Sequence, residues 1–368
     1  MSAIRGWCPG ALRPMESGDG WVVRIRPRGG RLSPAQAAGV ARAAAAYGNG
    51  LIDLTGRANL QLRGITQASH APLIADLRAL DLIDPDIATE THRNIIVTPF
   101  ADDAADALAA RLEAALAASA LPLPAKFGFA VDCGPTRCLA GVPADIRLEC
   151  SIDGRLMLRA DGMALGRPLA DVSQAIGLAA WFLQQGGAPG GRGRMARLIG
   201  RGVTPPATLA PAPAAPPASP GRTASGMLLA LEFGQTDPGT LAALARLGPI
   251  RLTPWRMLLL EGLTDMPDLP GLIADPSDPC LRLRACTGAP GCPQALAVTR
   301  PLARSLAPHL PDGAILHVSG CAKGCGWPHP ADITLTATPA GFDLIRGGRA
   351  SDSPLMRGLA PARLPEVL

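Results

Sequence analysis

The sequence predicts an α+β protein built from a duplicated unit, with the two copies related by pseudo-two-fold symmetry. Two observations lead to this fold class. A short segment occurs twice, once in each half of the 368-residue chain, and a Pro-rich stretch lies between the two copies. Self-similarity at a long period is typical of a duplicated structural unit. Ligands often bind where two such units meet, so we expect the functional site between the halves.

The Pro-rich stretch covers residues 203–224, where seven prolines stand among small residues without any apolar period. This composition favours an extended, semi-rigid linker over a packed element. The linker therefore separates the chain into its two halves.

The first half begins with a predicted βαββα unit. Ser33 and Pro34 suit the N-cap and first position of a helix, and Gly48 suits its end. Alternation and apolar periodicity supply the remaining elements. They are a strand over 21–26, a helix over 34–47, strands around 51–54 and 59–63, and a helix over about 71–80.

The second half is expected to repeat this unit, with a strand over 227–233, a helix over 238–247 and two further strands. LTGRANLQLRGI (54–65) aligns without gaps on LTPWRMLLLEGL (252–263), and five of the twelve positions are identical. The alternative is a pair of unrelated β-hairpins that share a leucine period.

Composition and charge exclude several classes of protein. The net charge of +5 and the twelve aromatic residues (five Trp, one Tyr, six Phe) do not fit a nucleic-acid reader. A modest positive charge suits a small polyanionic substrate. No apolar run is long enough to span a membrane, and the N-terminus lacks the apolar core of a signal peptide. We therefore expect a cytoplasmic protein with reduced thiols.

Four of the nine cysteines form a regular pattern. ACTGAPGCPQA contains Cys286-x5-Cys292, and SGCAKGCGWP contains Cys321-x3-Cys325. A cubane [4Fe–4S] cluster takes four thiolates, one for each iron, and the small residues around each pair let backbone amides approach the cluster. The alternatives are zinc, which prefers shorter gaps, two disulfides, which need an oxidising compartment, and four inert buried thiols.

The other cysteines make a weak case for a second metal site. Cys133 and Cys138 form one C-x4-C pair without two further ligands nearby, and we expect buried or incidental thiols there. The same expectation covers Cys8, Cys150 and Cys280.

The cysteine pattern resembles the cluster signature of the sulfite/nitrite reductase superfamily, in which the cluster lies beside a sirohaem. The duplication around a Pro-rich joint matches that superfamily as well. Within it, the chain is most similar to the precorrin-3B synthases of the aerobic cobalamin pathway. The stretches that carry this resemblance are WCPGALRPMESGDGWVVRIRPRGGRL, TGRANLQLRGI, ETHRNIIVTP, RLTPWR, ACTGAPGCPQA and SGCAKGCGWP, spread over residues 7–328.

The resemblance implies a sulfite/nitrite reductase-like α+β fold, with duplicated ferredoxin-like half-domains and cluster-binding α+β domains in pseudo-two-fold symmetry. The expected bounds are a first ferredoxin-like half-domain over 1–80, a first reductase-like domain over 81–202, the linker over 203–224, a second ferredoxin-like half-domain over 225–275 and a [4Fe–4S]-binding domain over 276–368.

The resemblance also implies substrate-binding residues. Arg57 and Arg93 fall on two arginines that bind the anion in the reductases, and Lys126 falls on the first of a Lys-x-Lys pair. Gly128 stands at the second lysine position, which argues against reduction of sulfite or nitrite. A precorrin carries acetate and propionate groups, which Arg binds bidentately. For four other arginines an ion-paired or solvated role is favoured, namely Arg63, Arg192, Arg194 and Arg197.

By the same resemblance, the enzyme oxidises precorrin-3A with O2 to precorrin-3B, through meso-carbon hydroxylation and γ-lactone formation. A mononuclear non-haem iron is implied besides the cluster. His92 and His329 are the histidines nearest the expected site, but no ligand set can be read from spacing. The alternatives are a sirohaem-dependent sulfite or nitrite reductase and a non-catalytic iron–sulfur electron-transfer protein.

We expect a separate reductase or ferredoxin-like carrier to supply the electrons. The segment Gly191-x-Gly193-x-x-Ala196 resembles a dinucleotide fingerprint, but it follows a predicted helix over 171–185 rather than a strand. The sequence therefore does not predict a nicotinamide site.

Overall fold

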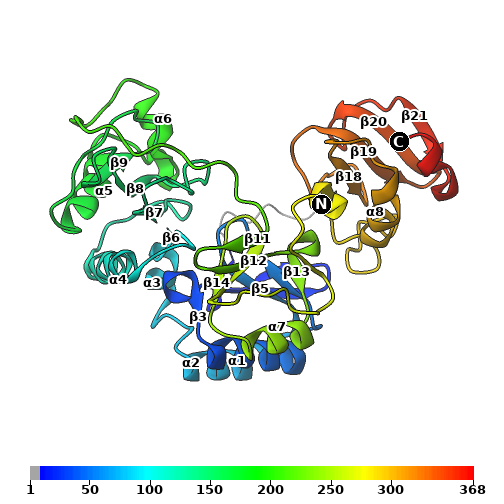
Figure 1. Ribbon diagram of the computed structural model, residues 1–368, viewed down its shortest axis with the longest axis horizontal. Coiled ribbons are helices and arrows are strands. Elements are labelled where there is room, and N and C mark those ends of the chain that lie inside the picture. Colours follow the sequence, from blue (N-terminus) through cyan, green and yellow to red (C-terminus); the bar gives the residue numbers. More distant parts are fainter. Residues whose placement is uncertain (1–8) are drawn as a thin grey trace.

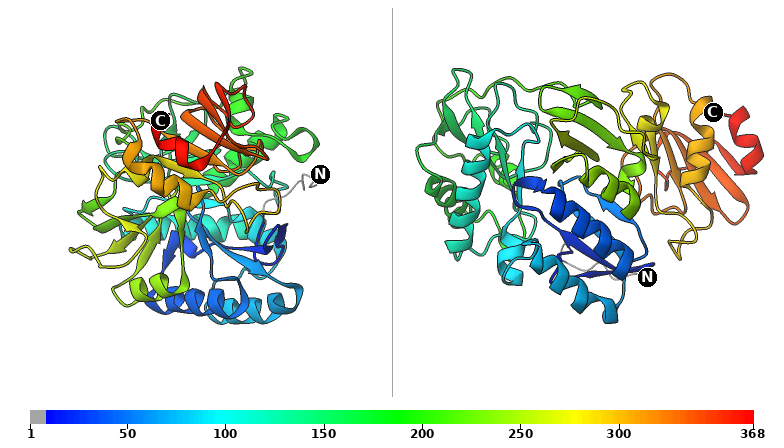
Figure 2. Two further views of the ribbon diagram at one scale, coloured as in Figure 1. Left: turned by 90° about the vertical axis from the view of Figure 1, so that its right-hand side faces the viewer. Right: turned by 60° about the horizontal axis from the view of Figure 1, so that its bottom comes forward.

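The computed structural model describes residues 9–368 and shows a central domain with one lobe on each side (Figure 1). Three helices lie side by side on the face of the central domain that points away from the lobes (Figure 2). They are α1 (Pro34–Tyr47), α2 (Gln67–Ala79) and α7 (Pro238–Ala245). In the part of the chain that the structure describes, no helix is long and apolar enough to cross a membrane.

The central domain contains two sheets that exchange strands. The first has the order β1 (Met15–Ser17), β2 (Gly20–Ile25), β5 (Leu60–Ile65), β4 (Ile52–Leu54), β13 (Gln235–Thr236). The second has the order β11 (Gly221–Thr223), β12 (Gly226–Leu231), β15 (Met257–Glu261), β14 (Ile250–Leu252), β3 (Arg31–Leu32), with β16 (Leu272–Ile273) also paired to β12. Each half thus completes the sheet of the other.

The structure confirms the predicted duplication at the level of single hydrogen bonds. The Thr55 Oγ1 accepts from the backbone N–H groups of residues 57 and 59, and the Thr253 Oγ1 accepts from those of residues 255 and 257. The turns also share a left-handed residue at the aligned position, Ala58 with φ 53° and Arg256 with φ 61°. Such a non-glycine conformation is uncommon, so its repetition supports a common origin of the two units.

The predicted ends of the first helix are confirmed. The Ser33 hydroxyl accepts from the Gln36 N–H at 3.2 Å, and the Gln36 side chain accepts from the Ser33 N–H at 3.0 Å. This capping box satisfies two backbone donors at once, and the helix ends at Gly48 as expected. The second unit lacks the last helix of the predicted βαββα pattern. Pro267 and Pro270 follow β15, and proline interrupts helical hydrogen bonding.

Both lobes repeat one sheet topology, in which the first three strands run parallel and the last two antiparallel. The first lobe contains β6 (Ile95–Val97), β7 (Phe129–Asp132), β8 (Ile146–Cys150), β9 (Leu156–Ala160) and β10 (Arg167–Pro168), with α3 (Ile87–His92), α4 (Asp103–Ala118), α5 (Ser173–Gln184) and α6 (Met195–Ile199) around them. The second lobe contains β17 (Leu283–Ala285), β18 (Leu316–Ser319), β19 (Ala331–Thr338), β20 (Gly341–Gly348) and β21 (Met356–Leu359), with α8 (Arg300–Leu306).

The Pro-rich segment is extended, but the expectation that it does not pack is wrong. Leu209, Pro211 and Ala214 each form a β-bridge to the first lobe, and Leu209 is only 9% exposed. The last residues of the segment form β11, the edge strand of the second central sheet. Proline lacks an N–H donor, so it fits such edge positions without leaving a donor unpaired.

Candidate iron–sulfur and substrate site

The fold brings the two cysteine motifs together. Cys286 directly follows β17, and Cys321 lies two residues beyond β18. These strands are parallel neighbours, with Ala285 opposite Val318, so both motifs begin at the same edge of the sheet. Cys292 is held on the loop after Cys286, where its N–H donates to the Gly288 carbonyl at 2.8 Å.

Small residues let the backbone approach Cys286 closely. The Gly320 N–H donates to the Cys286 Sγ at 3.2 Å. A Cβ on Gly326 would lie 2.6 Å from the Cys286 backbone nitrogen, so only glycine fits there. Backbone N–H groups directed at sulfur stabilise the thiolate form that iron binds.

The four thiols interact electrostatically. Partial burial raises the pKa of Cys325, and the sulfurs of Cys321, Cys286 and Cys292 raise it further, against the opposing effect of Lys323. Across residues 9–368, no three His, Cys, Asp or Glu side chains converge as ligands of a single metal ion. A [4Fe–4S] cluster binds each thiolate to a different iron, and it therefore fits thiols gathered at one sheet edge without a shared centre. The described residues offer no ligand set for a mononuclear iron.

The remaining described cysteines lie outside the two motifs. The Cys133 thiol donates to the Leu148 carbonyl at 3.6 Å and the Cys138 thiol donates to the Asp132 Oδ1 at 3.3 Å, so both act as donors within the first lobe. Burial raises the pKa of Cys133 and Cys138 to about 12 each, and that of Cys280 to about 11. Cys8 lies outside the described residues.

Arg57 lies where the central domain meets the first lobe. Its Nε donates to the Asn94 Oδ1 at 3.0 Å, and the Asn94 amide donates to the Phe127 carbonyl at 2.8 Å. The Arg57 guanidinium lies on Gly128, because a Cβ at that position would be 2.3 Å from the Arg57 Nη2. Lys126 is exposed two residues before Gly128. The structure thus places Arg57 against the segment that carries Lys126, and the Arg57 guanidinium takes up the space of a side chain at position 128.

Arg93 is already engaged in a buried ion pair. Its Nε and Nη2 each donate to Asp84 at 2.8 Å, and Nη2 also donates to the Arg26 carbonyl at 2.8 Å. The Arg93 side chain is 8% exposed and that of Asp84 only 2%. The bidentate edge that would bind a substrate carboxylate is therefore occupied by Asp84, and Arg93 instead fixes the backbone beside Asn94.

The other basic candidates divide into paired and exposed residues. Arg63 donates to Asp19 and Asp53, and Arg194 donates to the buried Asp145 at 2.9 Å. Arg192 and Arg197 are exposed. Arg63 and Arg194 therefore form ion pairs, as expected.

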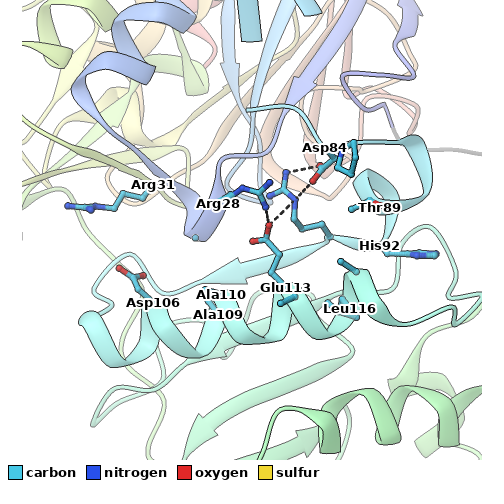
Figure 3. Close-up of a pocket in the computed structure, with 15 residues that line it drawn as sticks. Arg28, Arg31, Asp84, Thr89, His92, Asp106, Ala109, Ala110, Glu113 and Leu116 are labelled. Atoms are coloured by element: carbon cyan, nitrogen blue, oxygen red, sulfur yellow. Dashed lines mark hydrogen bonds and ion pairs between the residues drawn. The ribbon is translucent and has the colours of Figure 1, made fainter. Parts of the chain in front are cut away.

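A cavity of about 500 Å³ lies between α3, α4 and the loop after β2 (Figure 3). His92 and Arg93 line it, together with Ala109 and other small residues of α4. No cluster cysteine lines this cavity, so it does not join the iron–sulfur site. His329 lies elsewhere, with its ring 5.2 Å from that of Trp327.

His317 was not identified from the sequence. It lies on β18 with 0% exposure, and neither ring nitrogen has a hydrogen-bond partner in residues 9–368. Burial lowers its pKa from 6.5 to about 4. A lone histidine gives no sequence signal for this, because burial comes from strands distant in the chain.

The depressed pKa of His317 predicts acid sensitivity. Between the unfolded pKa of 6.5 and the folded pKa of about 4, the unfolded chain binds more protons, so stability falls as pH falls through this window. The loss should reach roughly 3 kcal/mol at the acid end. The free energy of unfolding of wild type and of His317→Gln, measured by urea denaturation across this pH range, checks this prediction. The variant should show a flatter pH dependence, and equal slopes would contradict the burial argument.

Comparison with known proteins agrees with the fold. The family model of the nitrite/sulfite reductase ferredoxin-like half domain matches residues 13–80. The NirA protein of Mycobacterium tuberculosis has the same fold, with a TM-score of 0.61 at 17% identity over 94% of this chain and 79% of that one. A ferredoxin–nitrite reductase of Synechococcus elongatus is 28% identical over 97% of this chain and 86% of its own.

A second relative identifies the family within this superfamily. A precorrin-3B synthase of a Sinorhizobium species is 31% identical to this chain, over 96% of it and 85% of the relative. The similarity therefore includes both halves, the lobes and the cysteine motifs. The chain belongs to the precorrin-3B synthase family within the sulfite/nitrite reductase superfamily.

Proposed function

We propose that this protein is an oxidoreductase that converts precorrin-3A to precorrin-3B with O2. The observation that carries the choice over a reductase is Gly128, which stands where the resemblance places the second reductase lysine and beside which the Arg57 guanidinium leaves no room for a longer side chain. The pocket therefore keeps the Arg57 guanidinium but lacks that lysine's point charge. Arg binds planar carboxylates in a bidentate manner, which suits a polycarboxylate tetrapyrrole better than a small anion.

In this proposal, Cys286, Cys292, Cys321 and Cys325 hold a [4Fe–4S] cluster, which supplies electrons one at a time. Arg57 and Lys126 bind substrate carboxylates and orient the carbon that reacts. Arg93 keeps Asn94, and through it Arg57, in place. The resemblance also implies a mononuclear iron, but the described residues offer it no ligand set, so no role rests on it.

The proposed reaction needs two electrons and two protons from outside the protein. One oxygen atom of O2 becomes the hydroxyl on the meso carbon, and the other leaves as water. The π bond between the meso carbon and the neighbouring ring A carbon breaks, the ring A acetate oxygen bonds to that ring carbon to close the γ-lactone, and the carboxyl proton ends on the new hydroxyl. A separate reductase or ferredoxin-like carrier is the proposed electron source. The Gly191–Ala196 segment follows α5 and runs into the five-residue helix α6, so it lacks the strand that a dinucleotide site requires.

The test begins with protein purified without oxygen. Its absorption spectrum should show a broad shoulder near ~400 nm without sirohaem bands, and incubation with precorrin-3A, reductant and 18O2 should add one labelled oxygen atom to the product. Sirohaem bands with reduction of sulfite or nitrite would favour the reductase alternative, which the cyanobacterial relative supports. Redox cycling without tetrapyrrole affinity would favour an electron-transfer protein.

Gly128→Ala should weaken substrate binding through Arg57. The added Cβ would lie 2.3 Å from the Arg57 Nη2 and 2.9 Å from the Asn94 Nδ2, so the guanidinium must move. We expect KM for precorrin-3A to rise roughly tenfold, equivalent to one lost charged hydrogen bond. Gly141→Ala is the control, because a Cβ there meets nothing within 4 Å.

A double-mutant cycle separates this effect from simple strain. In an Arg57→Ala background, Gly128→Ala should change KM no further, since the displaced group is gone. If the two substitutions act additively on KM, Gly128 does not act through Arg57.

A further inference from the structure

Three arginines of the second half gather near Cys286. Arg284 lies on β17 two residues before this cysteine, Arg300 begins α8, and Arg256 lies in the turn between β14 and β15. They come from three separate elements, so no sequence motif predicts that they lie close together.

Contacts place Arg256 and Arg300 on one short segment. Arg300 donates to the Gln235 Oε1, and its guanidinium carbon lies 5.8 Å from the centre of the Phe233 ring. Arg256 packs on the intervening Gly234, whose ideal Cβ would be 2.6 Å from the Arg256 Cδ. The two guanidinium groups therefore flank residues 233–235.

Arg284 reaches the same region from the cluster side. Its guanidinium carbon lies 5.0 Å from the centre of the Trp327 ring, on the loop that follows Cys325. One of its nitrogens donates to the carbonyls of Leu281 and Leu283. Arg284 is thus fixed by an aromatic face and by backbone, not by a carboxylate.

These arginines lack the counter-charge that other arginines of the molecule have. Arg251 and Arg304 pair with Glu261 and Glu232 at 2.5 Å each, whereas no ion pair to an Asp or Glu joins Arg256, Arg284 or Arg300 anywhere in residues 9–368. The Arg300 Nε is buried and has no hydrogen-bond partner in those residues. Arg284 and Arg300 are partly buried, and partly buried positive charge without a counter-charge is unfavourable, so a bound anion would offset it.

The charges also act on one another. Burial lowers the pKa of Arg300, with Arg63 and Arg256 adding to this effect and Asp53 and Cys286 opposing it. The group therefore combines close cationic side chains with proximity to Cys286.

The position of Arg256 connects the group to the space between the lobes. Its neighbour Trp255 stacks on Phe100, just before α4 of the first lobe, with ring centres 6.4 Å apart. The turn thus touches the first lobe, while Gly234, on which Arg256 packs, belongs to a segment that contacts β17 of the second lobe. In the aligned turn of the first half, Arg57 lies against Gly128 of the first lobe.

We propose that Arg256, Arg284 and Arg300 form a binding site for peripheral carboxylates of the tetrapyrrole substrate on the side of the cluster. This proposal rests on the proposed function and adds a second anchoring site to that of Arg57 and Lys126. A large macrocycle with carboxylates around its rim can contact both sites at once, which a small inorganic anion cannot. Together they would fix the orientation of the ring relative to the cluster.

The test measures binding of uroporphyrin III, an octacarboxylic tetrapyrrole, to anaerobically purified protein by fluorescence quenching. Arg256→Gln and Arg300→Gln should each raise Kd roughly tenfold and weaken its salt dependence. Arg256 is exposed, so its substitution leaves the fold intact. Arg304→Gln is the matched control, since it removes the same charge from α8 at a residue already paired with Glu232.

Several outcomes would overturn the proposal. Wild-type affinity in both the Arg256 and Arg300 variants would do so while leaving the proposed function intact. A shifted cluster reduction potential with unchanged Kd would assign the arginines to the cluster instead. If wild type binds uroporphyrin no better than its octamethyl ester, carboxylate recognition is absent, and the proposed function fails together with this site.

Discussion

Cys325→Ser is expected to lose both the iron–sulfur cluster and the enzymatic activity. Serine offers an alkoxide-forming oxygen in place of a soft thiolate, and a cubane cluster needs all four cysteine ligands for full stability. Cys325 is exposed, so the substitution removes no core packing, and the loss can be attributed to ligation. Iron and sulfide analysis of anaerobically purified protein, together with turnover of precorrin-3A, measures the effect.

Cys280→Ser is the matched control for this variant. Cys280 lies near the start of β17, but burial raises its pKa to about 11 and it is not one of the proposed ligands. The control should keep its iron and its broad absorption near ~400 nm. Full retention of either cluster or activity in Cys325→Ser would contradict the assignment of this residue.

Breaking the Arg93–Asp84 pair is expected to destabilise the fold. Both side chains are buried, and two hydrogen bonds of 2.8 Å join them. Removing Arg93 leaves Asp84 buried without an ion-pair partner, and removing Asp84 leaves Arg93 with only the longer contact to Glu113 at 3.6 Å. Breaking a buried pair in this way typically costs about 3–5 kcal/mol. Arg93→Met and Asp84→Leu should therefore each lower the free energy of unfolding by about this amount, as measured by urea denaturation.

The double variant distinguishes a structural role from a role in substrate binding. If the pair is structural, Arg93→Met combined with Asp84→Leu should be more stable than either single variant, because no lone charge remains. A substrate anchor would behave differently. Arg93→Met would then keep wild-type stability while KM rises, and Asp84→Leu would show little effect on either quantity.

The sequence by itself determined those features that depend on local pattern. Ser33, Pro34 and Gly48 predicted the ends of α1 because capping involves residues a few positions apart. The duplicated segment predicted the pseudo-two-fold arrangement, which the matching bonds of Thr55 and Thr253 confirm. The spacing of the four cysteines predicted a cluster site, although their ligation stays a prediction.

Only the tertiary structure decided which groups meet across long distances in the chain. The exchanged strands β3 and β13 have two residues each, too few for any periodic signal. The packing of the Pro-rich segment arises from contacts with the first lobe that composition does not encode. Sequence position suggested the same role for Arg57 and Arg93, but their contacts differ, because Asp84 pairs with the Arg93 guanidinium whereas the Arg57 guanidinium lies beside Gly128. The physical reason is that burial and charge pairing depend on neighbours in space, whereas a sequence motif specifies only neighbours along the chain.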